Sequence, residues 1–332
     1  MPKINNLITA LILIVCAACE NPYHPDSGGD GGTGTTPGEG KSNKNLTLRV
    51  SDFEQTTFNE NDNDGESGQP TEKRHGLSRS GVSAKEMCSL LSFAVYSNAD
   101  GSYKKVGEVS QDCGDNSFGT AELSVDKGSY LLVVIGHNGT GKATMTNPEK
   151  ITFPNNKTTD TFFCSHNFTI SDDKAATIDL CLKRAVAKVV FSPEDKTPDK
   201  VAKMQFYYTG GSSTFDAISG KGCVNSKQTE ERNVEPEAHD GSSSYDIYTF
   251  PRDNSNAISL QVTAFENNGT ALFKRQFNNI PVTSNFITRC HGKFFGDDAS
   301  GGRVAPGVSI DGQWSSEHDY QFEDPSSEFE TE

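Results

Sequence analysis

The fold is decided at residues 129–148, which read SYLLVVIGHNGTGKATMTNP. The run before Gly136 is apolar and rich in β-branched residues, as in a buried strand. The following residues match the phosphate-binding pattern G-x-x-x-x-G-K up to Lys142, a pattern that requires a helix to begin at the lysine. Here Ala143 replaces the Ser or Thr that would bind a metal ion, and Pro148 follows in a segment poor in helix formers. The stretch therefore predicts a glycine-rich loop between strands.

Further strand-like runs lie on both sides of this stretch. They cover residues 46–50, 90–96, 118–125, 161–170, 175–182, 185–192, 201–208, 244–250, 258–265, 271–277 and 286–295. Turn residues separate them, and Asn267-Asn268-Gly269 between two alternating runs is a hairpin signal. No window has a helical period long enough to cross over a parallel sheet. We therefore predict an all-β protein of antiparallel β-sandwiches.

Two series of strands follow one another along the chain. We expect an N-terminal β-sandwich domain at residues 45–184 and a C-terminal β-sandwich domain at residues 185–298. The remaining tail, residues 299–332, carries apolar residues at even spacing between 304 and 310. It is either the last strand of the second domain or a donor strand for a neighbouring subunit, and the sequence does not choose between them.

The chain carries 45 acidic and 30 basic residues, which gives a formal net charge of −15 over 332 residues. Such a body repels phosphate backbones, so we expect no nucleic acid among its partners. Anionic membrane surfaces are disfavoured for the same reason. Attachment to a membrane would therefore need something other than charge.

The N-terminal residues contain a candidate signal for lipid attachment. Residues 1–18 contain an apolar run shorter than the roughly 20 residues that span a bilayer as a helix, which is typical of an export signal. Ala17 and Ala18 before Cys19 resemble the lipobox of bacterial lipoproteins, although Cys16 stands where leucine is usual. The resemblance implies a lipoprotein signal peptide cleaved before Cys19, with fatty acyl chains such as palmitate attached to that cysteine. The alternative is an ordinary cleaved signal that leaves Cys19 unmodified.

Residues 19–44 are rich in Gly and Pro and contain no aliphatic side chain. A segment of this composition cannot bury apolar surface, so we expect a flexible tether. A lipid, a tether and a β-rich body together are the layout of a surface or periplasmic lipoprotein.

Other motifs do not indicate catalysis or metal binding. Residues 60–65 (ENDNDG) resemble the start of a calcium loop, but Thr71 stands where the bidentate glutamate belongs, so we expect no metal site. Cys290 and His291 are neighbours on a predicted strand and face opposite sides, which argues against a catalytic dyad. Cysteines beyond Cys19 are even in number and permit disulfides with open pairing: Cys88, Cys113, Cys164, Cys181, Cys223 and Cys290. We expect neither an enzyme nor a cofactor.

Several stretches resemble the fimbrillin family of Bacteroides-type bacteria, which comprises stalk, tip and anchor subunits of fimbriae. They are ATIDLCLKRAVAKVVF (176–191), FYYTGGSSTFDAISGKG (206–222) and RQFNNIPVTSNFITRCHGKFF (275–295). Two others, LSVDKGSYLLVVIGHN (123–138) and ITFPNNKTTDTFF (151–163), are similar to its anchor branch. The resemblance implies two transthyretin-like β-sandwich domains, export to the outer membrane and assembly by strand donation.

The same resemblance implies that proteolysis separates the roles of subunits. In stalk members an Arg-specific protease removes the first strand and opens a groove, whereas an anchor keeps its first strand and its lipid. Candidate cleavage positions here are Arg49, inside the first strand pattern, and Arg74 and Arg79, in the polar loop after it. The alternative for each is a solvated surface arginine.

The sequence thus favours a structural fimbrial subunit, either the outer-membrane anchor or an accessory minor subunit. Its expected partners are other fimbrial subunits, through strand pairing, and the outer membrane, through the lipid; its expected role is in cell adhesion. The alternative is a surface lipoprotein that binds a glycan or another ligand. A single tryptophan makes a tryptophan-lined sugar platform less attractive.

Overall fold

The computed structural model describes residues 44–55, 78–79, 83–98, 101–171, 175–241, 243–296 and 316–322. They belong to one compact unit, Ser42–Glu332. The predicted signal peptide, Cys19, nearly all of the predicted tether and the calcium-like segment lie outside the described residues. Within the described part, no helix is long and apolar enough to cross a membrane.

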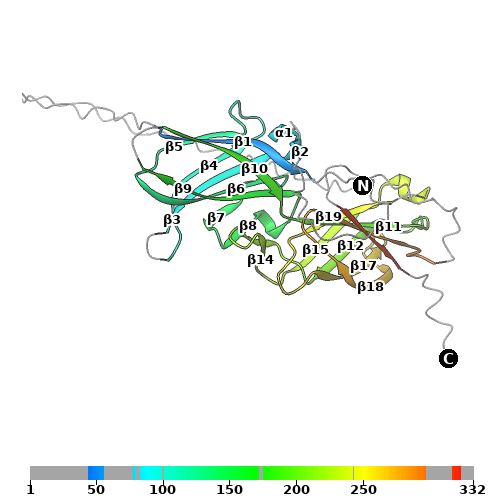
Figure 1. The fold of residues 1–332 in the computed structure, drawn as a ribbon. Coiled ribbons are helices and arrows are strands. Elements are labelled where there is room, and N and C mark those ends of the chain that lie inside the picture. Colours follow the sequence, from blue (N-terminus) through cyan, green and yellow to red (C-terminus); the bar gives the residue numbers. More distant parts are fainter. Residues whose placement is uncertain are drawn as a thin grey trace, which may run out of the picture. The chain divides into compact units, whose positions relative to one another are not determined.

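Almost all of the elements are strands (Figure 1). The strands are β1 (Leu46–Gln55), β2 (Ser78–Arg79), β3 (Leu90–Ser97), β4 (Lys104–Asp112), β5 (Thr120–Leu123), β6 (Gly128–His137), β7 (Thr144–Asn147), β8 (Lys150–Thr152), β9 (Thr161–Ile170), β10 (Ala176–Arg184), β11 (Ala187–Pro193), β12 (Lys203–Thr209), β13 (Thr214–Asp216), β14 (Lys221–Gly222), β15 (Lys227–Asn233), β16 (Tyr245–Thr249), β17 (Ala257–Phe265), β18 (Ala271–Pro281), β19 (Phe286–Gly292) and β20 (Ser316–Gln321). The helical elements are α1 (Ala84–Met87) and the short 3-10 turns η1 (Pro154–Asn156) and η2 (Pro236–His239). The prediction of an all-β fold is confirmed.

The described strands form four sheets. The largest runs β2-β1-β10-β9-β6-β3-β4, and β5 pairs with β1 beside that path. Two four-stranded sheets, β16-β11-β19-β20 and β15-β12-β17-β18, pack around one shared apolar cluster. The fourth sheet, β14-β13-β8-β7, combines strands that lie far apart in the sequence.

Antiparallel pairing predominates, but three pairs of described strands are parallel. They are β1 with β10, β11 with β19, and β19 with β20. The expectation of antiparallel sandwiches holds for most pairs, and these three depart from it. A parallel pair needs a long connection. In the first two pairs, whole groups of intervening strands provide that connection in place of a helix.

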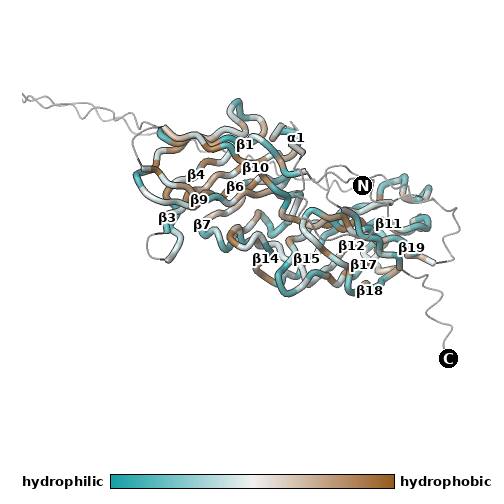
Figure 2. Tube along the Cα trace, in the orientation of Figure 1, coloured by the Kyte–Doolittle hydropathy of each residue, from teal (hydrophilic) through white to brown (hydrophobic). Residues whose placement is uncertain are grey.

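The core is built around strands that are covered on both faces. β3 is buried along its length except at its two ends. On one face Phe93 packs into a cluster with Leu48, and on the other Tyr96 packs into a second cluster with Phe215 and Phe250. This second cluster joins the largest sheet to the fourth sheet. Figure 2 shows the hydrophobic residues concentrated along the strands and the hydrophilic ones in many of the connections.

The glycine-rich loop lies between strands, as predicted. β6 ends at His137 and β7 begins at Thr144, so Lys142 leads into a strand and not into a helix. The backbone N–H of Gly139 donates a hydrogen bond to Nδ1 of His137 (3.1 Å), and the imidazole ring lies edge-on to Phe153 at 5.3 Å. A Cβ at position 139 would lie 2.9 Å from that nitrogen, so a residue with a side chain would be too close to the imidazole. Burial lowers the pKa of His137 to about 4.

Arg184 ties three segments together at the end of β10. Its Nε and Nη2 donate to the two carboxylate oxygens of Asp160 at 2.7 and 3.0 Å, and its Nη1 donates to Oδ1 of Asn285 at 3.0 Å. The guanidinium also lies 4.6 Å from the centre of the Phe162 ring. The contacts reach across residue 184, where we expect the two domains to meet; the division itself stays a prediction.

Candidate functional site

The first strand, β1, is built into the interior of the largest sheet. It pairs with β10 on one side and with β5 and β2 on the other (Figure 1). Leu46, Leu48 and Phe53 are at most 2% exposed and pack into one core cluster. Phe53 contacts Phe162 edge-on, with ring centres 5.1 Å apart. The strand that follows the predicted tether is therefore part of the core.

The structure separates the candidate cleavage positions. Arg49 has an exposed side chain, but its backbone lies between Asp179 in β10 and Thr120 in β5. A protease must pair with an extended substrate backbone, so Arg49 is accessible only if β1 leaves the sheet. Arg79 lies in β2, at the end of the sheet, opposite Glu54. Arg74 and the lipid position Cys19 lie outside the described residues.

The last described strand, β20, is an edge strand with polar contacts. It runs parallel to β19, and the Arg289 guanidinium donates to both carboxylate oxygens of Glu317 at 2.9 Å. At the end of β20, Phe322 packs into the core: it is 7% exposed, and its ring stacks on that of Phe191 with ring centres 5.5 Å apart. Gly292 allows this approach, since a Cβ there would lie 2.3 Å from the Phe322 carbonyl oxygen. Residues 316–321 thus form the last described strand, with Phe322 directly after it. The apolar positions 304–310 of the tail lie outside the described residues.

His291 connects β19 to both neighbouring segments. Its Nδ1 lies 2.7 Å from Glu194 Oε1, and its Nε2 lies 2.5 Å from Asp319 Oδ1 in β20. Burial alone would lower the pKa of His291, but the hydrogen bonds to the two carboxylates raise it above its ordinary value. Cys290 points the other way, into the core, where burial raises its thiol pKa to about 12. The two side chains therefore face opposite sides of β19, as expected.

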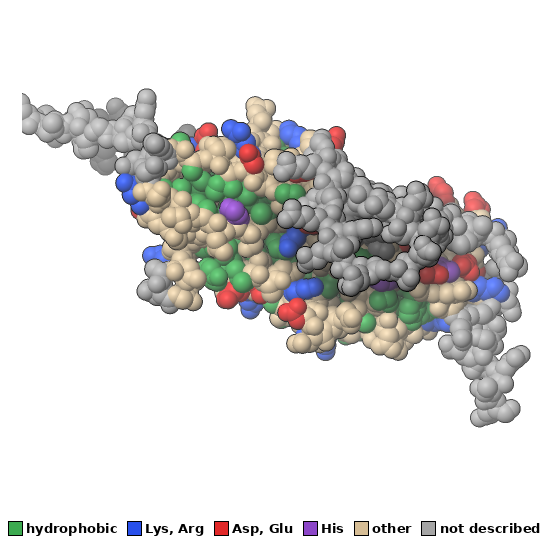
Figure 3. Space-filling model, in the orientation of Figure 1, with side chains coloured by type: hydrophobic (Ala, Val, Ile, Leu, Met, Phe, Trp, Pro, Cys, Tyr) green, Lys and Arg blue, Asp and Glu red, His purple; other side chains and the backbone are tan. Residues whose placement is uncertain are grey.

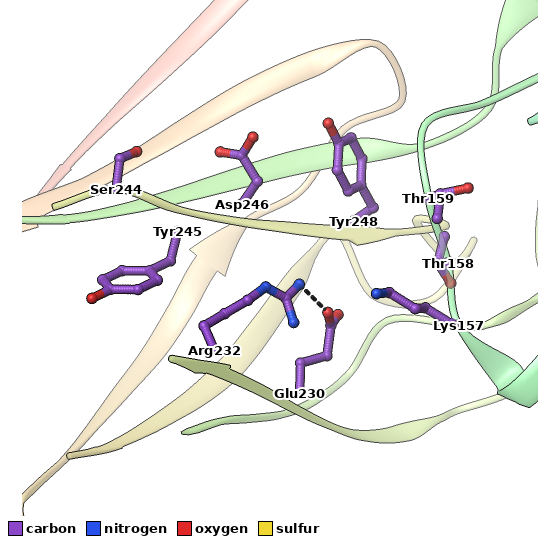
Figure 4. Close-up of a pocket in the computed structure, with 9 residues that line it drawn as sticks. All are labelled: Lys157, Thr158, Thr159, Glu230, Arg232, Ser244, Tyr245, Asp246 and Tyr248. Atoms are coloured by element: carbon purple, nitrogen blue, oxygen red, sulfur yellow. Dashed lines mark hydrogen bonds and ion pairs between the residues drawn. The ribbon is translucent and has the colours of Figure 1, made fainter. Parts of the chain in front are cut away.

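A pocket of about 290 Å³ lies where two sheet edges meet a loop. β15 and β16 are each the end strand of their sheet. β15 supplies Glu230 and Arg232, and the loop before β9 supplies residues 157–159. The segment around β16 supplies Ser244, Tyr245, Asp246 and Tyr248. Figure 4 shows Glu230 and Arg232 pointing toward each other, with the Lys157 side chain directed at the same pair. The lining side chains contain no aliphatic residue. Sequence reasoning missed this pocket.

None of the described cysteines forms a disulfide. Cys88 and Cys290 are buried, and Cys164 is half-buried; Cys113, Cys181 and Cys223 are exposed. Among the described residues, no cluster of three or more His, Cys, Asp or Glu side chains is suited to a metal ion. On the face in Figure 3, basic and acidic side chains lie interspersed, with hydrophobic side chains in small patches between them.

Several solved structures of bacterial proteins are similar to this chain. A candidate adhesin from Bacteroides ovatus is 16% identical, with a TM-score of 0.46, over 68% of this chain and 89% of that one. The fimbrial anchor protein Mfa2 from Porphyromonas gingivalis is 12% identical, with a TM-score of 0.38, over 69% of this chain and 80% of that one. A candidate cell adhesion protein from Parabacteroides distasonis is 11% identical, with a TM-score of 0.42, over 83% of this chain and 94% of that one.

One of these neighbours is a fimbrial anchor protein, and the other two are candidate adhesion proteins. At identities of 11–16% they assign no activity or partner to this chain. No curated protein matches it. A match over more than half of the chain does exist, at residues 142–330, to a family of unknown function, DUF6562. The protein belongs to that family.

Proposed function

We propose that the protein is a non-catalytic subunit of a surface fimbria, held in the outer membrane by a lipid on Cys19. Its position is that of the anchor or of an accessory minor subunit. The observation that supports this role best is the placement of β1, which is buried and paired on both sides. An anchor needs its first strand, because that strand links the lipid to the folded body. The lipobox-like end, the tether and the fimbrillin resemblance support the same role.

The contribution of β1 to the core explains why its retention or loss would decide the role. Burying a large apolar side chain contributes about 2 kcal/mol, and β1 buries Leu46, Leu48 and Phe53. Their sum is comparable with the whole stability of a small domain, about 5–15 kcal/mol. Removing β1 would leave an apolar groove and unpaired backbone groups on β10 and β5. A strand donated by another subunit is the natural replacement.

The pairing of β1 implies that the candidate cleavage sites differ in their accessibility to a protease. Cleavage after Arg49 requires β1 to leave the sheet first, since its backbone is paired on both sides. Cleavage after Arg74 or Arg79 would cut the chain beyond β1 and leave that strand held by its contacts alone. We therefore expect an intact subunit to resist an Arg-specific protease at Arg49 more than at the other two positions.

Membrane fractionation of Cys19→Ala tests the anchor role. The wild-type protein should sediment with the outer membrane and carry fatty acyl chains at its terminus. The variant should appear in the soluble fraction, because the net charge of −15 provides no alternative attachment. Cys16→Ala, a cysteine three residues upstream, is the matched control and should stay in the membrane. Membrane retention of Cys19→Ala would disprove the proposal.

The intact mass of the protein recovered from cells, with co-purification of its neighbours, separates the two kinds of subunit. An acylated terminus at Cys19 together with other fimbrial subunits is the expected result. A new terminus after Arg49, Arg74 or Arg79 would instead make the protein a polymerising subunit that exchanges its first strand.

A further inference from the structure

The dipeptide Asn-Gly occurs twice in the chain, at residues 138–139 and 268–269, and each time a threonine follows. Asn-Gly is chemically labile, because glycine has no Cβ to keep the preceding side chain away from its backbone nitrogen. A bond can form between that nitrogen and Cγ of the asparagine, while Nδ2 leaves as ammonia with the proton of the glycine N–H. Since the local sequence is the same at both sites, a difference in their reactivity must come from the fold.

Asn138 is held by a segment that is distant in the sequence. Its Oδ1 accepts the backbone N–H of Ser89 at 2.9 Å, and its Nδ2 donates to the Met87 carbonyl at 3.0 Å, both at the connection between α1 and β3. The Gly139 N–H donates to Nδ1 of His137, a residue that is 1% exposed. A Cβ at position 139 would lie 2.9 Å from that nitrogen, so the space around the glycine is already filled. The carboxamide and the nitrogen that would attack it are therefore both fixed by the folded body.

Asn268 is held only by its own turn, at the exposed tip of the hairpin between β17 and β18. Its Oδ1 accepts the Thr270 N–H at 2.8 Å, and its Nδ2 donates to Oε2 of Glu266 at 2.9 Å. The Gly269 N–H donates to the Glu266 carbonyl at 3.0 Å. A small opening of the tip therefore frees the carboxamide and the glycine nitrogen together. No atom lies within 4 Å of the point where a Cβ of residue 269 would stand, so there is room for the reaction.

We propose that Asn268 is a site of spontaneous deamidation in the folded protein and that the fold protects Asn138 from the same reaction. Attack by the Gly269 nitrogen forms a succinimide and releases ammonia. Water then opens the ring at one of its two C–N bonds, which gives aspartate or isoaspartate at position 268. The only co-reactant is water, and no electrons are transferred. The modification does not depend on the anchor role, because the hairpin tip is remote in the sequence from Cys19 and from β1.

The product alters the hairpin. A carboxylate at position 268 faces the Glu266 carboxylate where a hydrogen bond of 2.9 Å stood, so two like charges repel each other. Isoaspartate also adds a methylene to the main chain, inside the turn that the hydrogen bond from the Glu266 N–H to the Thr270 carbonyl closes at 2.9 Å. β18 is the end strand of its sheet and is paired there with β17. Modification of Asn268 therefore loosens the start of β18 and adds one negative charge to the tip.

Peptide mapping by mass spectrometry, during incubation of the purified full chain in mildly alkaline buffer, tests the proposal. Trypsin separates the two sites, since the peptide 128–142 contains Asn138 and the peptide 253–274 contains Asn268. In the folded chain we expect Asn268 to react at least about tenfold faster than Asn138, because local opening is far easier at an exposed tip than beside the core. In denaturant the two rates should become similar. A rate at Asn268 no faster than that at Asn138, or modification of Asn268 only in denaturant, would overturn the proposal.

Two substitutions separate the chemistry from its consequence. Gly269→Asn keeps the turn, because asparagine tolerates the positive φ of 88°, but its Cβ shields the attacking nitrogen, so most of the modification at Asn268 should be lost. An unchanged rate in that variant would contradict the mechanism.

Asn268→Gln removes the reactive side chain. After equal incubation, hydrogen exchange should accelerate in residues 264–273 of the wild type and stay constant in this variant. Equal acceleration in both would refute the predicted effect on β18. Thermal unfolding midpoints show that each variant is folded. Cys19→Ala should deamidate like the wild type, which separates this test from that of the anchor role.

Discussion

The first and the last described strands are both parallel to a neighbour, yet they are held by opposite kinds of contact. β1 lies inside a sheet and is fixed by buried Leu46, Leu48 and Phe53. β20 lies at an edge and is fixed mainly by the Arg289–Glu317 pair and by His291, with Phe322 as its apolar anchor. Loss of apolar burial affects the whole core, whereas loss of partly exposed charge pairs affects one strand. The N-terminal strand of the body is thus integrated into the core, whereas the last described strand is held by more local contacts.

The largest effect is expected at β1. Phe53→Ala removes a ring that is 2% exposed and packs against Phe162, so the free energy of unfolding should fall by about 3–5 kcal/mol. Denaturant unfolding followed by circular dichroism measures this loss. Arg49→Ala, in the same strand but exposed, is the matched control and should change stability by less than about 0.5 kcal/mol. Equal effects of the two substitutions would show that β1 is not part of the core.

The second largest effect is expected at low pH, where the free energy of unfolding should fall. His137 has a folded-state pKa of about 4, against about 6.5 in the unfolded chain, because it is buried. As the pH falls, the imidazole is protonated in the unfolded state before it is protonated in the folded state. The free energy of unfolding is therefore unaffected by this group above pH 6.5 and falls by up to about 3 kcal/mol as the pH drops to 4. The unfolding free energy of the wild type and of His137→Gln should be compared across this range. The variant should show a shallower slope, and identical slopes would exclude His137 as the cause.

A smaller and local effect is expected at the last strand. Phe322→Ala should release β20 from β19 at a cost of about 2 kcal/mol, less than at Phe53, because the rest of the sandwich stays folded. Hydrogen exchange should accelerate in residues 286–292 and 316–321 and stay unchanged in β1. Acceleration throughout the protein would mean that β20 is as integral as β1.

The smallest effect is expected from the His291 contacts. The hydrogen bonds to Glu194 and Asp319 raise its pKa, so their contribution is complete below the unfolded value of about 6.5 and is lost as the pH rises through the higher folded value. Hydrogen exchange of β20 should therefore increase from pH 6 to pH 8 beyond its intrinsic rise. His291→Gln should remove that extra increase. Its persistence in the variant would assign the pH response to another group.

Much of the strand pattern was predictable, because most strands bury one face or both. The alternation at 46–50 and the apolar run at 129–135 predict β1 and β6, and the run at 118–125 predicts β5 with bounds that are too wide. β4, β15 and the short strands β2, β7, β8, β13 and β14 were missed. β15 reads KQTEERN and lies at a sheet edge, where a strand needs no apolar side chains.

The pairing of strands that are distant in the sequence could not be predicted from the sequence. The parallel partners of β1 and β19 depend on which strands meet after the chain has folded, and no local pattern encodes that choice. The pocket was missed for the same reason, since Lys157 and Arg232 are far apart in the sequence and each alone resembles an ordinary surface residue. The position of Arg49 was predicted correctly as part of the first strand, but its pairing on both sides was not.

The parallel register of β1 and β10 has a mechanical consequence. The predicted tether enters β1 at Leu46, beside Ala176 of β10 and Leu123 of β5. Tension along the axis of β1 would load both hydrogen-bond ladders in shear, so that many bonds must break together and not one after another. Forced unfolding is governed by the rate of crossing that barrier. For the anchor role that we propose, the lifetime of the attachment under flow would then depend on this one strand.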